Sequence, residues 1–128
     1  MNKIIIDTNI YSNLLRGDSE VNDTLRQVSH IGISIISIGE LLSGFRVGNR
    51  IKENRDELGQ FLDSPRVAIY PLEVDTAEHY SSILNKLKQN GTPIPTNDIW
   101  IAAVALQHGL PLYTQDNHFS YVDGLLLR

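Results

Sequence analysis

The run Ile4-Ile5-Ile6-Asp7-Thr8-Asn9 constrains the fold more than any other part of the chain. Its three β-branched apolar residues do not alternate with polar ones, which predicts a strand buried on both faces, as in a parallel sheet covered by helices. Asp7 would then lie at the carboxyl end of the strand, the edge where open α/β sheets bind ligands. A carboxylate there is costly to desolvate unless a positive group meets it. The sequence therefore predicts a positive partner beside Asp7.

Strand and helix patterns alternate along the rest of the chain. Further strands are predicted at 31–36, 67–70 and 112–114, and residues 125–127 could add an edge strand. Helices are predicted between the strands, with Asn9, Ser37 and Asn97 in capping positions. This order predicts one α/β domain over residues 1–128, with a central, mainly parallel sheet of four or five strands and right-handed crossovers.

Composition excludes several classes of protein. The absence of Cys excludes a disulfide framework, a thiolate zinc site and a cysteine nucleophile. The formal net charge of −4 argues against a protein that holds nucleic acid through overall positive charge. It does not exclude a nuclease that uses bound cations, because such an enzyme needs carboxylates. No apolar run approaches the roughly 20 residues of a membrane helix, so a cytoplasmic protein without membrane contact is expected.

Four carboxylates are predicted at one edge of the sheet. Asp7 and Asp116 follow strands, whereas Glu40 and Asp98 open helices. Because strand ends and helix starts share one edge of a parallel sheet, these groups would repel one another unless some are protonated or a divalent cation lies among them. With no Cys in the chain and no His placed near them, oxygen ligands favour a hard cation, Mg²⁺ or Mn²⁺. Two such ions about 3.5–4 Å apart could activate a water and stabilise the leaving oxygen of a phosphodiester.

Each carboxylate except Asp7 also has an ordinary structural explanation. Ser37-x-x-Glu40 fits a capping box, in which the carboxylate bonds back to the helix start. Asp98 is favoured by the helix dipole, and Asp116 could hydrogen-bond its own turn. Taken singly, Glu40 and Asp98 are better explained in this way. Only the set of four, in this order, indicates a metal site.

Four short motifs occur in a characteristic order along the chain. They are Asp7-Thr8-Asn9 behind an apolar strand, Ile35-x-x-Ile38-Gly39-Glu40-Leu41-x-x-Gly44, Asn97-Asp98-x-x-Ile101-Ala102-Ala103 and Leu112-x-Thr114-x-Asp116-x-x-Phe119. Together they resemble the PIN-domain nucleases and, more narrowly, the VapC-type toxins of bacterial toxin–antitoxin pairs. The resemblance runs to Phe119, nearly the whole chain, and it implies a PIN-like three-layer fold with helices on both faces of the sheet.

The resemblance also implies a function and a set of site residues. The carboxylates would form the family's acidic quartet, which binds Mg²⁺ or Mn²⁺ for endonucleolytic cleavage of RNA: Asp7, Glu40, Asp98 and Asp116. Asn9 and Thr114 would hold these carboxylates in place, although helix capping and strand propensity explain the two residues equally well. The family further implies a homodimer neutralised by a small antitoxin protein, whose tail can lie in the groove near the quartet. Some relatives carry a further acidic residue where this chain has Asn117 and His118, and this difference bears on the second metal ion.

Other polar and aromatic residues give weaker signals. Arg46, Arg50 and Arg55 could guide a phosphate backbone, but interleaved acidic residues favour a solvated helix face. His118 lies close enough to Asp116 to suggest a general acid, yet a His in a surface turn is more often without function. Trp100 could stack on a base or pack against a neighbour, and its apolar helix favours packing.

Two other interpretations remain at this level. A haloacid-dehalogenase-like phosphatase also carries an Asp after its first strand, but that class uses Asp-x-Asp with the second Asp as general acid. Asn9 cannot deliver a proton in that role. A catalytically idle PIN module would act only by binding a partner protein or RNA, and it would take up no metal.

Overall fold

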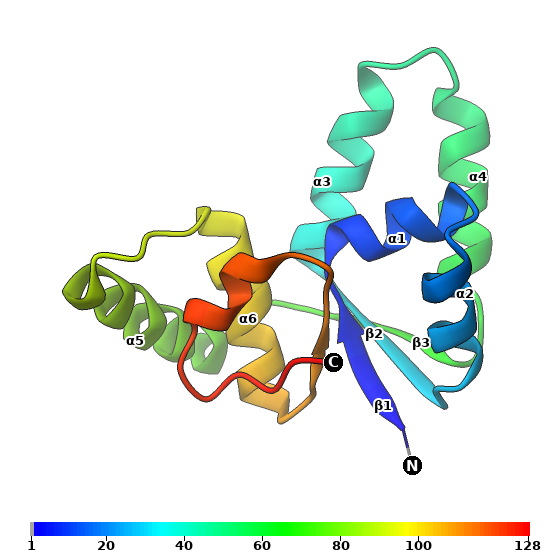
Figure 1. Ribbon diagram of the computed structural model, residues 1–128. Coiled ribbons are helices and arrows are strands. Elements are labelled where there is room, and N and C mark those ends of the chain that lie inside the picture. The colour runs from blue at the N-terminus through cyan, green and yellow to red at the C-terminus, as the bar shows by residue number, and fades with distance from the viewer. Residues whose placement is uncertain (1) are drawn as a thin grey trace.

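The computed structural model describes residues 2–128 as a parallel sheet with helices packed on both of its faces (Figure 1). The sheet has four strands in the order β3-β2-β1-β4, and every pair of neighbours is parallel. The predicted α/β fold with a parallel central sheet is confirmed, and the predicted edge strand at 125–127 is reduced to one isolated bridge between Leu112 and Leu127. In chain order the elements are β1 (Lys3–Ile6), α1 (Thr8–Leu15), α2 (Ser19–Arg26), β2 (His30–Ser34), α3 (Ile35–Arg46), α4 (Ile51–Leu62), β3 (Val67–Tyr70), α5 (Val74–Asn90), α6 (Thr96–His108), β4 (Leu112–Tyr113) and the 3-10 helix η1 (Asn117–Tyr121).

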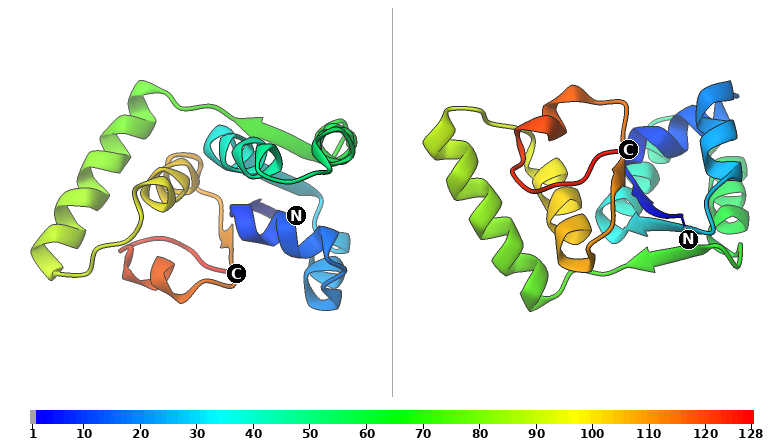
Figure 2. Two further views of the ribbon diagram at one scale, coloured as in Figure 1. Left: turned by 90° about the horizontal axis from the view of Figure 1, so that it is seen from above. Right: turned by 60° about the horizontal axis from the view of Figure 1, so that its bottom comes forward.

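The isoleucines of β1 point into two different cores. Ile4 and Ile6 pack with side chains of α1, α2, α3 and α4, whereas Ile5 packs with side chains of α5 and α6. All three isoleucines are fully buried. Figure 2 shows α5 and α6 on one side of the sheet and α1, α2 and α4 on the other. The burial of both faces of this strand, predicted from its lack of alternation, is confirmed.

Gly32 in β2 leaves room for an aromatic ring on the sheet. It pairs with Ile5 across the β1–β2 ladder. A Cβ atom at Gly32 would lie 2.6 Å from Cε1 of Tyr70, so the ring takes the place of a side chain there. Two histidines contact the ring: its hydroxyl lies 2.7 Å from Nε2 of His30, and it packs edge-to-face with the His108 ring at a centroid distance of 4.6 Å. Only glycine fits at this position of β2.

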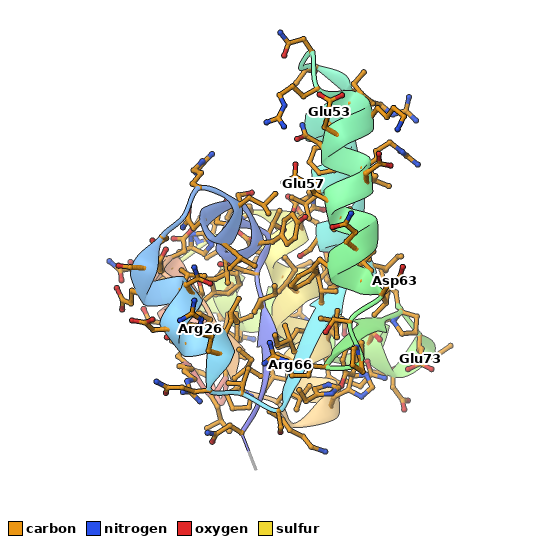
Figure 3. All side chains as sticks on the ribbon, turned by 90° about the vertical axis from the view of Figure 1, so that its right-hand side faces the viewer. Arg26, Glu53, Glu57, Asp63, Arg66 and Glu73 are labelled. Carbon is orange, nitrogen blue, oxygen red and sulfur yellow. The ribbon has the colours of Figure 1, made fainter. Side chains whose placement is uncertain are left out.

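Helices α3 and α4 form an arm that extends beyond the carboxyl edge of the sheet (Figure 1). Basic residues of the arm pair with acidic residues of α4. Arg50 contacts Glu53 at 3.4 Å and Glu57 at 4.0 Å, and Figure 3 shows both glutamates along α4. These exposed pairs agree with the predicted solvated helix face.

Helix α6 is buried nearly all round between the sheet and α5. Its residues Ile99 and 101–105 are 0–2% exposed. The Trp100 ring stacks on Tyr80 of α5, with centroids 4.0 Å apart and planes at 22°, which supports packing as the role of Trp100. None of the helices between residues 2 and 128 combines the length and the apolarity needed to cross a bilayer.

Candidate metal centre

The four predicted carboxylates face one hollow at the carboxyl edge of the sheet. Asp7 follows β1, Glu40 projects from α3, Asp98 comes from the first turn of α6, and Asp116 follows β4. The hollow has a volume of about 420 Å³. We call it the acidic hollow, and its lining residues are Asp7, Thr8, Asn9, Glu40, Pro95, Thr96, Asn97, Asp98 and Asp116.

Asp7 is buried and both of its oxygens accept hydrogen bonds. Its Oδ1 accepts from the backbone N–H of Ile10 at 3.0 Å and so caps α1, and its Oδ2 accepts from the Thr114 hydroxyl at 2.5 Å. The expectation that Asp7 has no structural role was therefore wrong. Burial raises the pKa of Asp7 and outweighs the bonds from Thr114 and Ile10, which lower it. The negative charge of Asp116 raises this pKa further.

Glu40 is positioned differently from the sequence-based expectation. Strand β2 ends at Ser34, whose hydroxyl oxygen accepts a hydrogen bond from Ile36 N at 3.1 Å and caps α3. The helix thus begins at Ile35, Glu40 lies in its second turn, and the predicted capping box with Ser37 was wrong. Ser37 is instead fully buried.

Two residues hold the Glu40 carboxylate: Thr8, which had no predicted role, and Asn97, whose predicted position as a helix cap was wrong because Pro95 takes the cap position of α6. The Thr8 hydroxyl donates to Oε1 at 2.6 Å and lies 2.9 Å from the Ser37 hydroxyl, and Nδ2 of Asn97 donates to Oε2 at 3.3 Å. Thr8 follows Asp7 and Asn97 precedes Asp98 in the sequence. That adjacency was the one signal in the sequence for their roles.

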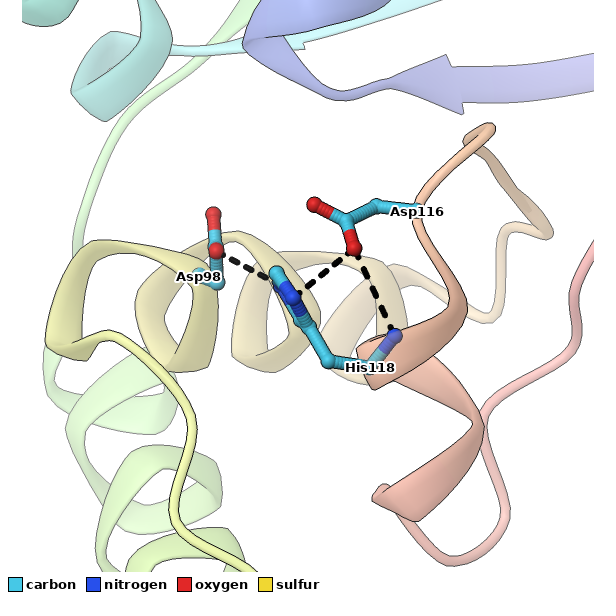
Figure 4. Close-up of side chains that lie close together, drawn as sticks. All are labelled: Asp98, Asp116 and His118. Atoms are coloured by element: carbon cyan, nitrogen blue, oxygen red, sulfur yellow. Dashed lines mark hydrogen bonds and ion pairs between the residues drawn. The ribbon is translucent and has the colours of Figure 1, made fainter.

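His118 lies between Asp98 and Asp116 (Figure 4). Its Nε2 is 2.7 Å from Oδ2 of Asp98, and its Nδ1 is 2.8 Å from Oδ1 of Asp116. The turn that carries it, η1, is capped by the Asp116 carboxylate. The expectation of no His near the carboxylates was therefore wrong, because sequence spacing does not reveal that η1 turns the ring toward α6. The expectation that His118 has no function stays a prediction.

The carboxylates influence one another electrostatically. Burial raises the pKa of Asp98, contact with His118 opposes this, and the charges of Glu40 and Asp7 raise the pKa again. Asp98, Asp116 and His118 offer one ligand atom each, and these three atoms lie within 4.8 Å of one another. Mutually repelling oxygens with one imidazole nitrogen fit a divalent cation, and the nitrogen suits Mn²⁺ better than Mg²⁺.

Thr114 and Asn9 occupy the positions next to the quartet. The Thr114 hydroxyl donates to Asp7 and accepts from the backbone N–H of Asp116 at 2.9 Å, so it joins two of the carboxylates. Asn9 lies inside α1 rather than at its cap, because Asp7 takes the cap position. Asn9 lines the acidic hollow, and its predicted action on the carboxylates stays a prediction.

The contacts of His118 predict an effect on metal binding. In His118→Ala the carboxylates of Asp98 and Asp116 lose the ring that spans them, and we expect Mn²⁺ affinity to fall by at least about 10-fold. Calorimetric titration of the metal-free protein with Mn²⁺ measures this. His79→Ala, on α5, is the control and should bind Mn²⁺ like the original protein. A higher affinity in His118→Ala would mean that the ring competes with the cation instead of ordering its ligands.

The comparisons with known proteins agree with the geometry of the site. The family model of the PIN domain matches residues 4–125. Ribonuclease VapC1 of Rickettsia felis is 35% identical over 95% of this chain and 92% of its own length. Ribonuclease VapC4 of Mycobacterium tuberculosis is 32% identical over 70% of this chain and 68% of its own length. Among solved structures, VapBC2 of Rickettsia felis bound to a DNA fragment from its promoter superposes with a TM-score of 0.91, covers 98% of this chain and 97% of that chain, and is 24% identical, a likeness of fold.

Proposed function

Because this chain belongs to the PIN-domain family and, within it, to the VapC ribonucleases, we propose that it is a divalent-metal-dependent endoribonuclease and the toxin of a toxin–antitoxin pair. The observation that carries the proposal is the convergence of the acidic quartet on one hollow. The quartet comes from four separate elements, and two of its members have pKa values raised by burial. Clustered carboxylates whose ionisation is opposed by burial are typical of sites that bind cations.

The proposed reaction is hydrolysis of an RNA phosphodiester bond. A bound Mg²⁺ or Mn²⁺ would supply positive charge that makes water more acidic and stabilises negative charge developing on the phosphate. The quartet would hold that cation, with His118 as a neighbouring nitrogen donor. Thr114 would fix Asp7, and Thr8 with Asn97 would fix Glu40, so that the ligand oxygens need no rearrangement when the cation binds.

The phosphatase alternative is not favoured by the surroundings of Asp7. Each oxygen of Asp7 accepts one hydrogen bond from the protein, which fixes the carboxylate and leaves a lone pair on each oxygen for a cation. Asn9, where that class has its general acid, lies in the first turn of α1 and carries an amide. These features support a role for Asp7 as a ligand.

The toxin half of the proposal concerns partners. Structures similar in fold include VapBC-1 of Haemophilus influenzae and DNA-bound VapBC of Salmonella typhimurium. We propose that this chain acts in the cytoplasm as a homodimer neutralised by a small antitoxin, part of which lies near Asp7. Induced expression should arrest growth, and co-expression of the short open reading frame next to its gene should relieve the arrest. If growth arrest persists when each neighbouring open reading frame is co-expressed, the proposed antitoxin partner is wrong.

Metal removal tests the enzyme half directly. We expect the protein to cut a structured RNA transcript internally when Mg²⁺ or Mn²⁺ is present, and cleavage to fall by more than about 100-fold in EDTA because the quartet then repels the phosphate backbone. Primer extension that maps new 5′ ends measures cleavage at internal bonds. Restoration by Mn²⁺ after dialysis controls for irreversible unfolding. Cleavage that persists unchanged in EDTA would refute the metal dependence.

A further inference from the structure

The acidic hollow continues into a second, more polar hollow beyond Asp116. The second hollow has a volume of about 470 Å³, and it shares Asn9 and Asp116 with the acidic hollow. We call it the Arg16 hollow, and its lining residues are Asn9, Asn13, Arg16, Gln115, Asp116 and Asn117. On the opposite side a third hollow, which includes Ile35 and Gly39, shares Glu40 and Asn97 with the acidic hollow. We call these three hollows, which are linked by the shared residues, the groove, and the quartet lines its middle hollow.

The groove carries one positive charge along its length. Of the residues that line the three hollows, all within the described part of the chain, Arg16 alone is cationic. The remaining charges are the four carboxylates of the quartet, which repel a phosphate backbone. Arg50 and Lys52, by contrast, pair with acidic residues of the arm. None of the ion pairs formed by residues 2–128 uses Arg16, so its charge is not neutralised within the chain.

Two amide side chains orient the Arg16 guanidinium. Its Nη1 donates to Oδ1 of Asn13 at 3.2 Å, and Nδ2 of Asn13 donates to Oε1 of Gln115 at 2.7 Å. These bonds turn the side chain back along α1 and tie the end of that helix to the loop after β4. A guanidinium has five N–H donors, so the bond to Asn13 leaves donors for a further ligand.

We propose that the Arg16 hollow binds a backbone phosphate of RNA next to the one that is cleaved, with Arg16 as the residue that contacts it. This inference rests on the proposed ribonuclease function and adds a substrate contact to it. A guanidinium recognises phosphate through paired hydrogen bonds, and neutral amides suit the sugar or base edge beside that phosphate. The Arg16 hollow shares Asn9 and Asp116 with the acidic hollow, so a phosphate bound there would belong to a nucleotide close to the cleaved bond.

The salt dependence of RNA binding tests this contact. The probe is a fluorescein-labelled 12-nucleotide single-stranded RNA of mixed sequence, with Ca²⁺ as the cation and a gel that verifies an intact probe. We expect Arg16→Gln to raise the dissociation constant about 5-fold and to lower the slope of log K against log salt by about 0.7, the value for one lost phosphate contact on a single strand. Arg16→Lys should keep most of the slope, because an ammonium still binds phosphate as a point charge.

Arg26→Gln is the matched control, because it removes the same charge. Arg26 is the last residue of α2 and lies near Arg66, toward the amino edge of the sheet and away from the groove (Figure 3). We expect its slope and affinity to match those of the unaltered chain. Equal losses of RNA affinity in Arg16→Gln and Arg26→Gln would indicate that the RNA responds to the overall charge of the protein. Unchanged affinity in both variants would show that the RNA does not use the Arg16 hollow. Either outcome overturns the proposal.

Cleavage kinetics separate this inference from the proposed function. We expect Arg16→Gln to raise KM about 5-fold and to change kcat less than 2-fold, because a neighbouring phosphate is held alike before and during the reaction. If the unaltered protein neither binds nor cuts RNA, the proposed function fails. If it does both and Arg16→Gln has the same salt slope and KM, only the Arg16 contact fails.

Discussion

Asp7→Asn should lose RNA cleavage by more than about 100-fold and should raise the melting temperature of the metal-free protein by a few degrees. Activity falls because the amide has no negative charge for a cation. Stability rises because burial and the charge of Asp116 both oppose ionisation of the Asp7 carboxylate. The carbonyl oxygen of Asn can still accept from Ile10 N, so the cap of α1 survives.

The pH dependence of stability checks the cause of that gain. A carboxyl group whose pKa is raised by folding favours the folded state while it is protonated, and this contribution is lost as the pH rises from the ordinary value of 3.8 through the raised pKa. The two melting temperatures, measured in EDTA, should therefore converge at acidic pH and separate above the raised pKa. A gap that stays constant from acidic to neutral pH would assign the gain to another cause.

Mn²⁺ should make the original protein more stable than Asp7→Asn. The cation binds the folded form of the original protein, so it should raise that melting temperature and affect Asp7→Asn much less. Asp75→Asn provides the matched control, because Asp75 is an exposed acidic residue in the first turn of α5, far from the acidic hollow. It should cleave RNA normally. Full activity of Asp7→Asn would refute the assigned role of Asp7.

Gly32→Ala should destabilise the protein by about 2–3 kcal/mol, the upper part of the range for an overpacked core. Its Cβ would lie 2.6 Å from Cε1 of Tyr70 and 3.4 Å from the carbonyl oxygen of Ile4. The ring cannot move aside without losing the contact with His30, and the strand cannot move without breaking its ladder with β1. Urea denaturation followed by circular dichroism measures the change in unfolding free energy.

Two further variants isolate the clash at Gly32. In a Tyr70→Ala background the Gly32→Ala change should cost little, so that the pair shows a strong coupling energy. Gly59→Ala in α4 should stabilise by about 0.5–1 kcal/mol, because nothing lies within 4 Å of its added Cβ and alanine favours helix. A Gly32→Ala protein that behaves like Gly59→Ala would show that the ring is free to move.

Local patterns in the sequence predicted much of the fold. The unbroken isoleucines of β1 predicted burial on two faces because the alternative, one solvated face, would have placed Ile5 or its neighbours in water. The positions of Asp7 and Asp98 relative to their strand and helix followed from the same reasoning. These features depend on residues adjacent in the chain, which a sequence displays directly.

The remaining features depend on contacts between distant segments. Ser34 and Ser37 are equally good helix caps locally, and the choice follows from the β2–β3 ladder, which continues as far as Ser34 opposite Tyr70. The position of His118 depends on the packing of η1 against α6, and no local pattern encodes it. The role of Thr8 likewise could not be predicted without knowing how close the end of β1 lies to α3.

The strand order β3-β2-β1-β4 has a consequence for synthesis of the chain. Strand β1 leaves the ribosome first, but its second neighbour, β4, begins at Leu112. Until that segment emerges, one edge of β1 is unpaired and the hydroxyl of Thr114 cannot reach Asp7. Translation at about 5–20 residues per second therefore imposes a delay of several seconds between the first strand and an assembled site. The acidic hollow is consequently complete only after nearly the whole chain has been synthesised.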